Sequence, residues 1–355
     1  MANAYIVGAV RTPGGKRDGK LSKIHPTDLG AAVLDELVLR TNIDSSLIDD
    51  VIFGCVSQSG AQAGNVARNA ILSSSLPISV PGTTVDRQCG SSQQAIHFAA
   101  QAVMSETQDI VIAGGVEVMS QVPIGSNIID GYKAGHGAPG QGEGMQEKYP
   151  GIQFSQFAGA EMIVEKFGLS REDLDAFAFA SHQKATNATS QGYFDKEIMP
   201  IKGQTPDGDT IMVTEDEGIR PDTSVESLSG LKNLSEGGSL TAGTSSQICD
   251  GAAAVMIVND EGLKKLGIKP RAKIIALALA GDDPVIMLTG PIPATKTALE
   301  KACPELDKSV SDTCLIPLYI ELMTGTLFRT YSYTEIILLP VRKLELGAFS
   351  VVKGL

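Results

Sequence analysis

Short apolar runs that alternate with helical patterns fill residues 5–113, and they constrain the fold more than any other feature. Residues 5–10 form an apolar run, and residues 27–40 follow with apolar side chains three or four positions apart. Such alternation predicts βαβ units, a mostly parallel sheet and therefore an α/β fold. The predicted strands are 5–10, 51–54, 80–86 and 109–113, and the predicted helices are 27–40, 65–75 and 91–105.

The alternation stops at about residue 120. The stretch 120–151 is rich in Gly, Pro and Gln and predicts a long loop, a feature that is usually functional or disordered. Two helices are predicted next, and the second has a capping signal because Ser170 is followed by Asp173. These two helices are 155–167 and 170–192, and a turn-rich stretch covers 193–250. The later predicted elements are the strands 252–258 and 272–280 and the helices 261–266 and 293–301.

Composition excludes several classes of protein. The 355 residues carry a net charge of −12 without a Lys- and Arg-rich run, which argues against nucleic-acid and anionic-membrane partners. The sequence has no run of about 18 apolar residues, so no transmembrane helix is predicted. The apolar run at the N-terminus has no basic residues before it and predicts a first strand rather than a signal peptide. Five widely spaced cysteines without a CxxC pair argue against a disulfide scaffold or a zinc site, and a reducing cytoplasm is the simplest compartment.

Cys89 stands where a predicted strand turns into a predicted helix. The strand ends near Asp86, Cys89 and Gly90 make the turn, and the helix begins at Ser91. Free N–H groups at a helix N-terminus stabilise a thiolate, and such sites lower a cysteine pKa from about 8.5 to roughly 3.5–7.5. Gly90 leaves room for a substrate carbonyl. The segment therefore predicts a nucleophile elbow with cysteine in place of serine.

A structural role is the competing interpretation of Cys89, because a free cysteine is most often a small buried residue. Cys55 and Cys249 are interpreted as structural, since the first lies in a predicted strand and the second precedes one. No motif surrounds Cys303 or Cys314.

Several motifs in a fixed order carry a family resemblance across residues 5–302. They are Ala9-Val-Arg-Thr-Pro13, Gln88-Cys-Gly-Ser-Ser92, Ala113-Gly-Gly-Val-Glu-Val-Met-Ser120, Leu240-Thr-Ala-Gly-Thr-Ser-Ser246, Asp250-Gly-Ala-Ala-Ala254 and Gly290-Pro-Ile-Pro-Ala294. Together they resemble the thiolase family of acetyl-CoA acetyltransferases and 3-ketoacyl-CoA thiolases.

The resemblance implies a thiolase-like five-layer α-β-α-β-α sandwich of two similar halves. It assigns residues 1–118, with 250–269 returning, to the N-terminal half and residues 119–249 to an inserted CoA-binding loop domain. Residues 270–355 would form the second half, which is expected to be incomplete, truncated or divergent after residue 302. A homodimer or homotetramer is also implied.

The resemblance further implies that Cys89 takes the acyl group from an acyl-CoA, with CoA and acyl-CoA as substrates and no tightly bound cofactor. Arg220 matches an arginine near the CoA adenine and phosphates, and Ser227 matches a serine in the same loop. Ser246 matches a serine at the pantetheine arm. Without the resemblance, Arg220 would be interpreted as a solvated charge and the serines as turn or cap residues.

At the start of one predicted helix the chain departs from the family. Many thiolases have His-Met there, and this chain has Gln156 and Phe157. Gln donates and accepts neutral hydrogen bonds, so an amide could still contact pantetheine, while the shape of the acyl pocket changes.

The tail is the larger departure. Thiolases continue with an Asn-Glu-Ala-Phe motif that holds a catalytic water, a Gly-His-Pro motif whose histidine activates the nucleophile, and a Cys-x-Gly-Gly motif whose cysteine moves a proton. None of the three occurs here, and the resemblance stops near Ala302. The different tail could come from a frameshift, from an alternative reading of the coding sequence or from real divergence.

The histidines of this chain offer no replacement. His97 lies about 12 Å along the helix axis from Cys89, which is beyond hydrogen-bond reach. His25, His136 and His182 are interpreted as surface or structural residues.

Three functions stay open. The first is a CoA-dependent acyltransferase that cleaves or forms a β-ketoacyl-CoA such as acetoacetyl-CoA. The second is a catalytically impaired or inactive CoA-binding relative, which the missing histidine and second cysteine favour. The third is a ketoacyl synthase, a condensing enzyme that also uses an elbow cysteine. The CoA-binding insertion with Arg220 and Ser246 agrees better with a thiolase than with this class. A dinucleotide-binding protein is disfavoured because no G-x-G-x-x-G motif follows the first strand.

Overall fold

The apolar runs of the N-terminal part form strands that are buried on both faces. All nine residues of β5 (Ile110–Val118) are buried. Ile110 and Ile112 pack into one hydrophobic core, while Val111 and Ala113 pack into a second core. Because successive side chains of a strand point to opposite faces, helices must cover both sides of this sheet.

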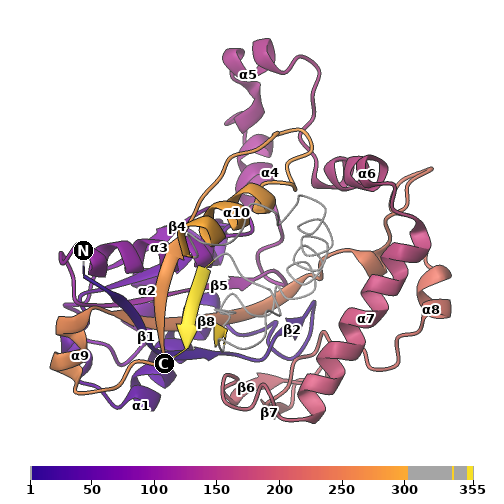
Figure 1. Ribbon diagram of the computed structural model, residues 1–355. Helices are drawn as coiled ribbons and strands as arrows, with labels where there is room; N and C mark the ends of the chain where they lie inside the picture. Colours follow the sequence, from indigo (N-terminus) through magenta and orange to yellow (C-terminus); the bar gives the residue numbers. More distant parts are fainter. Residues whose placement is uncertain (1, 303–337, 340–349, 355) are drawn as a thin grey trace.

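The computed structural model describes residues 2–302, 338–339 and 350–354, and Figure 1 shows the sheet with its covering helices. The elements before residue 120 are β1 (Ala4–Arg11), β2 (Gly15–Lys16), α1 (Pro26–Thr41), η1 (Ser45–Leu47), β3 (Asp50–Gly54), η2 (Gly60–Gln62), α2 (Val66–Ser73), β4 (Gly82–Val85), α3 (Ser91–Met104) and β5. The strands and helices predicted for this part are therefore confirmed, with shifts of a few residues at their ends.

The described residues form a nine-stranded sheet in the order β10-β11-β9-β1-β8-β5-β3-β4, with β2 paired to β8. Strands β3, β4 and β5 are parallel, but β8 (Cys249–Val258) runs antiparallel to both β1 and β5. The prediction of a mostly parallel sheet is thus wrong. A helical crossover links parallel strands, whereas β8 follows a long excursion of the chain that leaves its direction free.

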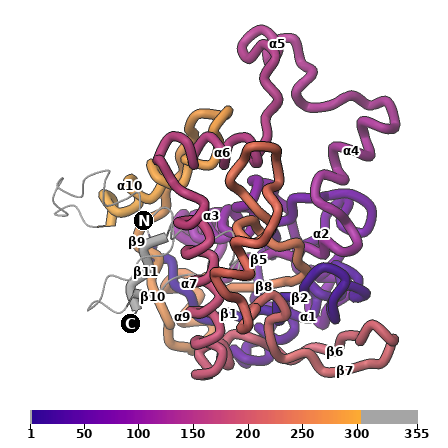
Figure 2. Tube along the Cα trace, turned by 90° about the vertical axis from the view of Figure 1, so that its right-hand side faces the viewer, coloured from indigo at the N-terminus to yellow at the C-terminus, as the bar shows by residue number. Residues whose placement is uncertain are grey.

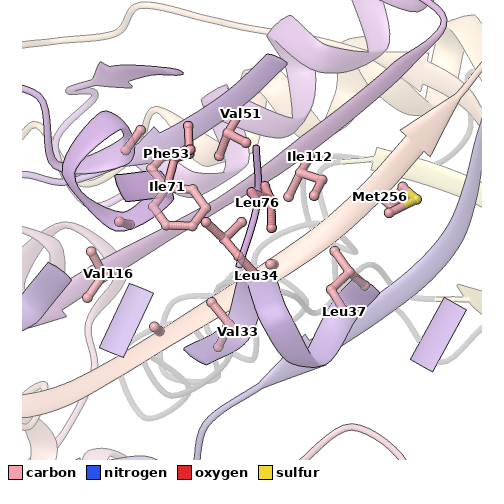
Figure 3. Close-up of a cluster of buried hydrophobic side chains, with 14 of the residues drawn as sticks. Val33, Leu34, Leu37, Val51, Phe53, Ile71, Leu76, Ile112, Val116 and Met256 are labelled. Carbon is pink, nitrogen blue, oxygen red and sulfur yellow. The ribbon is translucent and has the colours of Figure 1, made fainter. Parts of the chain in front are cut away.

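Two helix layers bury the two faces. Helices α1 and α2 cover one core, to which they contribute Leu34, Leu37 and Ile71 beside Phe53 and Met256 of the sheet (Figure 3). Helix α3 covers the opposite core through Ala95, Ile96 and further small residues. Small side chains bring α3 close to the sheet.

Residues 119–249 leave the sheet after β5 and return at β8, where Val118 pairs with Asp250. The excursion contains α4 (Ser126–Lys133), η3 (Pro139–Gln141), α5 (Glu143–Lys148), α6 (Gln156–Phe167), α7 (Arg171–Ser190), β6 (Ile201–Gln204), β7 (Thr210–Val213), α8 (Val225–Ser229) and η4 (Ala242–Thr244). Both helices predicted between residues 155 and 192 are confirmed, and the Ser170 and Asp173 side chains form the predicted capping box.

Helices α4 and α5 correct the prediction of an unstructured loop over 120–151. They form an arm that projects from the body, as Figures 1 and 2 show. Neither helix has a buried residue, and Ile128, Ile129 and Tyr132 are between 44% and 58% exposed. Glycines in this stretch masked the two short helices in the sequence pattern.

A buried arginine joins the excursion to the sheet. Arg11, at the end of β1, is 2% exposed and makes two bonds to Asp216, at 2.6 and 2.9 Å, and one to Glu197 at 2.7 Å. Its guanidinium also lies 5.5 Å from the ring centre of Phe194. Backbone bonds from Arg11 to Glu197 and from Met199 to Arg11 continue the junction.

The remaining elements are α9 (Asp260–Leu266), β9 (Ala272–Leu277), α10 (Pro291–Ala302), β10 (Leu338–Leu339) and β11 (Ser350–Gly354). The strand and helix predictions at 261–301 are confirmed. The predictions for the tail, including an incomplete second half, fall mostly on residues 303–337, 340–349 and 355, outside the described residues. The division into 1–118, 119–249 and 270–355 stays a prediction.

Asp216→Asn is expected to lower the free energy of unfolding by about 3 kcal/mol, because it leaves the buried Arg11 charge with one carboxylate. Urea denaturation followed by circular dichroism measures this change. The matched control is Asp207→Asn at an exposed position of the β6–β7 turn. Equal stability of the two variants would contradict the anchoring role of Arg11.

Candidate active site

Cys89 lies in a tight turn between β4 and α3. Its φ angle is +60°, a left-handed conformation that a non-glycine residue rarely adopts and that costs on the order of 1–3 kcal/mol. The turn is held by a hydrogen bond of 2.7 Å from the Gly90 N–H to the Arg87 carbonyl, and the Ser91 hydroxyl accepts the Arg87 N–H at 3.0 Å. This strained strand-to-helix turn has the geometry of a nucleophile elbow.

Two glycines let the elbow approach the sheet. A Cβ atom on Gly54, the last residue of β3, would overlap the backbone of Ser91 and Ser92. A Cβ atom on Gly115 of β5 would overlap the Ser92 hydroxyl and the Gly54 carbonyl. The first turn of α3 therefore lies directly on the ends of β3 and β5, which sets the position of Cys89.

The expectation of a lowered Cys89 pKa is wrong, because the surroundings of the thiol raise it. The pKa is raised above its ordinary value, first by desolvation of the sulfur and then by the negative charge of Asp86, while the Gln156 amide lowers it. Cys89 is nevertheless exposed as a whole residue, so reagents can reach it. Desolvation is therefore the leading influence on the pKa of this thiol.

Gln156 is the first residue of α6, and its side-chain nitrogen donates to the Cys89 sulfur at 3.5 Å. The N-cap Ser155 starts the helix by accepting the Ala158 N–H. Phe157 follows and is 60% exposed. The structure thus brings Cys89 together with Gln156, two predicted site residues that are 67 positions apart.

Of the other predicted site residues, Arg220 and Ser246 lie on two neighbouring loops of the excursion, and Ser227 lies in the first turn of α8. Arg220 and Ser227 are exposed, and Ser227 forms a capping box with Ser224 at the start of α8. Ser246 is exposed after η4, and the adjacent Gln247 donates to the Gly218 carbonyl at 2.9 Å, which ties the two loops together. In the described part of the chain, the side-chain hydrogen bond of Cys89 goes to Gln156, while Arg220 and Ser227 bond to His182 and Ser224. The assignment of Arg220, Ser227 and Ser246 to the site stays a prediction.

Two further cysteines are buried. Cys55 is 1% exposed, and desolvation followed by the charge of Glu117 raises the pKa of its thiol far above the usual range. Glu117 also accepts the Val56 and Ser57 N–H groups and the Gln62 amide. Cys249 is 5% exposed at the start of β8. Both positions fit the predicted structural roles, and Cys303 and Cys314 lie outside the described residues.

In the described part of the chain, the side-chain partner of the Cys89 sulfur is Gln156 and not one of the four histidines. His25 caps α1 by accepting the Thr27 N–H. His97 is buried on α3, and desolvation, followed by the charge of Arg87, lowers its pKa to about 4. His136 is exposed in the arm, and His182 is buried on α7.

Sequence reasoning missed several residues that shape the site. Gly54 and Gly115 determine how closely α3 approaches the sheet, and desolvation sets the direction of the Cys89 pKa, with a smaller contribution from Asp86. The Gly114-Gly115 pair within an apolar strand was the available signal, because an interior glycine marks close backbone approach. The desolvation of the sulfur could not be read from the chain, because it depends on packing.

Comparisons with known proteins agree with this geometry. The family model of the thiolase N-terminal domain matches residues 4–261. A steroid 3-ketoacyl-CoA thiolase of Mycobacterium tuberculosis is 48% identical over 85% of this chain and 73% of its own length. A 3-ketoacyl-CoA thiolase of Aliivibrio fischeri is 42% identical over 86% of this chain and 78% of its own length.

The crystal structure of a Bacillus anthracis acetyl-CoA acetyltransferase matches with a TM-score of 0.74 at 36% identity, over 85% of this chain and 77% of that chain. The fold is therefore the mixed α/β fold of an acyltransferase. More particularly, the chain belongs to the thiolase family.

The described residues also bear on membrane and metal binding. No helix there is long and apolar enough to cross a membrane. No group of three or more His, Cys, Asp or Glu side chains in the same part of the chain is arranged to hold a metal ion.

Cys89 is expected to react with iodoacetamide faster than Cys55 or Cys249, because it alone of these three is exposed. Limited labelling of the folded protein, followed by peptide mapping, gives the order. Labelling after unfolding in urea is the control that all three peptides are detected. Faster labelling of Cys55 or Cys249 would contradict the elbow assignment.

Gln156→Leu is expected to slow labelling of Cys89 at pH 8 by about 2- to 10-fold, because the lost hydrogen bond raises the thiol pKa further and lowers the thiolate fraction. The matched control is Gln153→Leu, which changes an exposed glutamine three residues earlier. An identical rate for both variants would mean that the Gln156 amide does not stabilise the thiolate.

Proposed function

We propose that this protein is a CoA-dependent acyltransferase that cleaves or forms a β-ketoacyl-CoA, such as acetoacetyl-CoA, through an acyl-Cys89 intermediate. The observation that carries the proposal is the exposed Cys89 thiol in a strained elbow with the Gln156 amide 3.5 Å from its sulfur. The names of the thiolase relatives support the substrate class.

The proposed cleavage has two steps. The Cys89 thiolate attacks the β-keto carbonyl, the bond between the α- and β-carbons breaks, and the released α-carbon takes a proton to give acetyl-CoA. The thiolate of a second CoA then attacks the acyl-cysteine, which forms the shortened acyl-CoA and restores Cys89. A covalent cysteine divides one difficult step into two easier steps because a thiolate attacks and leaves well.

CoA enters this scheme as a substrate. We assign its adenine and phosphate end to Arg220, with Ser227 on the same loop, and its pantetheine arm to Ser246 and Gln156. The bond from Gln247 to the Gly218 carbonyl supports a shared site, because it connects the loop of Ser246 with the loop of Arg220. Phe157, exposed beside Gln156, would line the acyl pocket.

A catalytically impaired relative is the second candidate, and the environment of Cys89 favours it. The sequence lacks the Gly-His-Pro and Cys-x-Gly-Gly motifs, and none of its histidines contacts the thiol in the described structure. Loss of one oxyanion-hole donor costs about 10²–10³ in rate, and loss of a general base about 10²–10⁴. These factors need not multiply, because the groups act as a unit.

Incubation with acetoacetyl-CoA is expected to place an acyl group on Cys89, while thiolysis stays far below ordinary enzyme rates of about 1–10³ s⁻¹. Peptide mass spectrometry locates the acyl group, and loss of absorbance of the enolate of acetoacetyl-CoA measures thiolysis. Circular dichroism of the same sample controls for folding.

Cys89→Ala is the matched control and should remain unlabelled. Absence of the acyl group from Cys89 in the folded protein would contradict the covalent mechanism. Thiolysis at ordinary rates would instead contradict the impaired alternative and leave the acyltransferase proposal standing.

We also propose that the protein assembles as a homodimer or homotetramer in the cytoplasm. The projecting arm supports assembly, because helices without any buried residue gain stability by covering side chains such as Ile128, Ile129 and Tyr132. Light scattering after gel filtration should give two or four times the monomer mass. A monomer at micromolar concentration would contradict this proposal.

A further inference from the structure

A buried histidine contacts the loop that carries Arg220. His182 lies on α7 and is 6% exposed. The backbone N–H of Arg220 donates to its Nδ1 atom at 3.3 Å, across 38 positions of the chain. Neither the elbow nor its chemistry uses this imidazole.

We propose that His182 is a positioning residue for CoA binding: its neutral imidazole holds the backbone of Arg220, and protonation of the ring releases that backbone and weakens binding. The inference rests on the proposed role of Arg220 at the phosphates of CoA. His182 itself would not touch the ligand.

The loop on either side of Arg220 is held by other contacts. Glu217 donates its N–H to the Gly14 carbonyl at 2.8 Å, and its carboxylate accepts the Lys20 N–H at 3.0 Å. The Gly218 carbonyl accepts the Gln247 amide. On the far side, Ser224 caps α8. Between these points Arg220 makes two backbone bonds: its carbonyl accepts the Thr223 N–H at 3.2 Å within the loop, and its N–H donates to His182. The bond to His182 joins Arg220 to α7 and therefore helps to set how the guanidinium is presented.

The bond requires a neutral ring. Nδ1 accepts a hydrogen bond only when it carries no proton, and both ring nitrogens are donors in the imidazolium. Burial, and after it the positive charge of Arg220, lowers the pKa of His182 below its ordinary value. The acceptor is therefore present at neutral pH and is lost only as the pH falls through this lowered pKa.

In the described part of the chain, the elements packed against α7 bring charged groups of both signs near the imidazole. Helix α7 packs against α8 and η4. The charged residues of these elements and of the loop between β7 and α8 are Arg171, Glu172, Asp173, Asp175 and Lys184 on α7, Glu215, Asp216, Glu217, Arg220 and Asp222 on the loop, and Glu226 on α8, whereas η4 carries none. Of these, only Arg220 acts on the His182 pKa, so protonation would place two positive charges together.

Calorimetric titration of the full chain with CoA at pH 8 and pH 5.5 tests the proposal with three variants. Arg220→Ala removes the phosphate contact and should weaken binding about 10- to 150-fold. His182→Phe removes the acceptor and should weaken binding about 3- to 10-fold at pH 8, with a smaller difference from the unchanged protein at pH 5.5. His182→Asn keeps an oxygen acceptor that does not titrate, and should bind like the unchanged protein at pH 8.

The pH comparison separates positioning from a merely structural role. Phosphate groups of CoA also take up protons near pH 6, and this affects every variant alike. Between pH 8 and pH 5.5 the unchanged protein should therefore lose more affinity than His182→Asn does. Circular dichroism confirms the fold of each variant at both pH values, and the Asn comparison stands even if His182→Phe fails to fold.

The outcomes are distinct. Unchanged CoA affinity of Arg220→Ala would remove Arg220 from the site and overturn the proposed CoA assignment together with this inference. Weak binding by Arg220→Ala, combined with equal pH dependence of His182→Asn and the unchanged protein, would overturn only the role of His182. Weak binding by His182→Asn at pH 8 would likewise overturn it, because an acceptor would then not suffice.

Discussion

The buried guanidinium of Arg11 is the interaction on which the arrangement of the two parts depends. It lies at the end of β1 and binds Asp216 and Glu197, which both belong to the excursion between β5 and β8. A buried charge of this kind is tolerated only with its partners in place. The loops that carry Arg220 and Gln247 therefore stay near the carboxyl ends of the parallel strands, where the elbow also lies.

The site combines rigid support with a thiol that the surroundings do not activate. Gly54 and Gly115 let α3 lie on the sheet and hold Cys89 in a left-handed turn. Desolvation and Asp86 raise the thiol pKa, and Gln156 offsets only part of this effect. A neutral amide can stabilise a thiolate, but it cannot accept the proton that the thiol must lose. The Gln156 amide therefore stabilises a thiolate without serving as the base that forms it.

Local signals in the sequence predicted local structure well. Ser170 and Asp173 predicted the start of α7, and the apolar runs predicted β1, β3 and β5, because caps and periodicity act over a few residues. The family motifs led to the thiolase assignment in the same way. One prediction failed where neighbours distant in the chain decide the outcome, because β8 runs antiparallel to its neighbours. Another failed for a local reason, because glycines in the arm concealed α4 and α5.

The sequence by itself thus determined the α/β class, the family and the elbow around Cys89, since each follows from contiguous residues. Only the tertiary structure decided that Gln156 reaches the sulfur, that desolvation raises the thiol pKa, and that His182 holds the backbone of Arg220. Burial and hydrogen bonds of this kind depend on distances of a few ångströms between segments far apart in the chain. Residue types and spacing do not encode those distances.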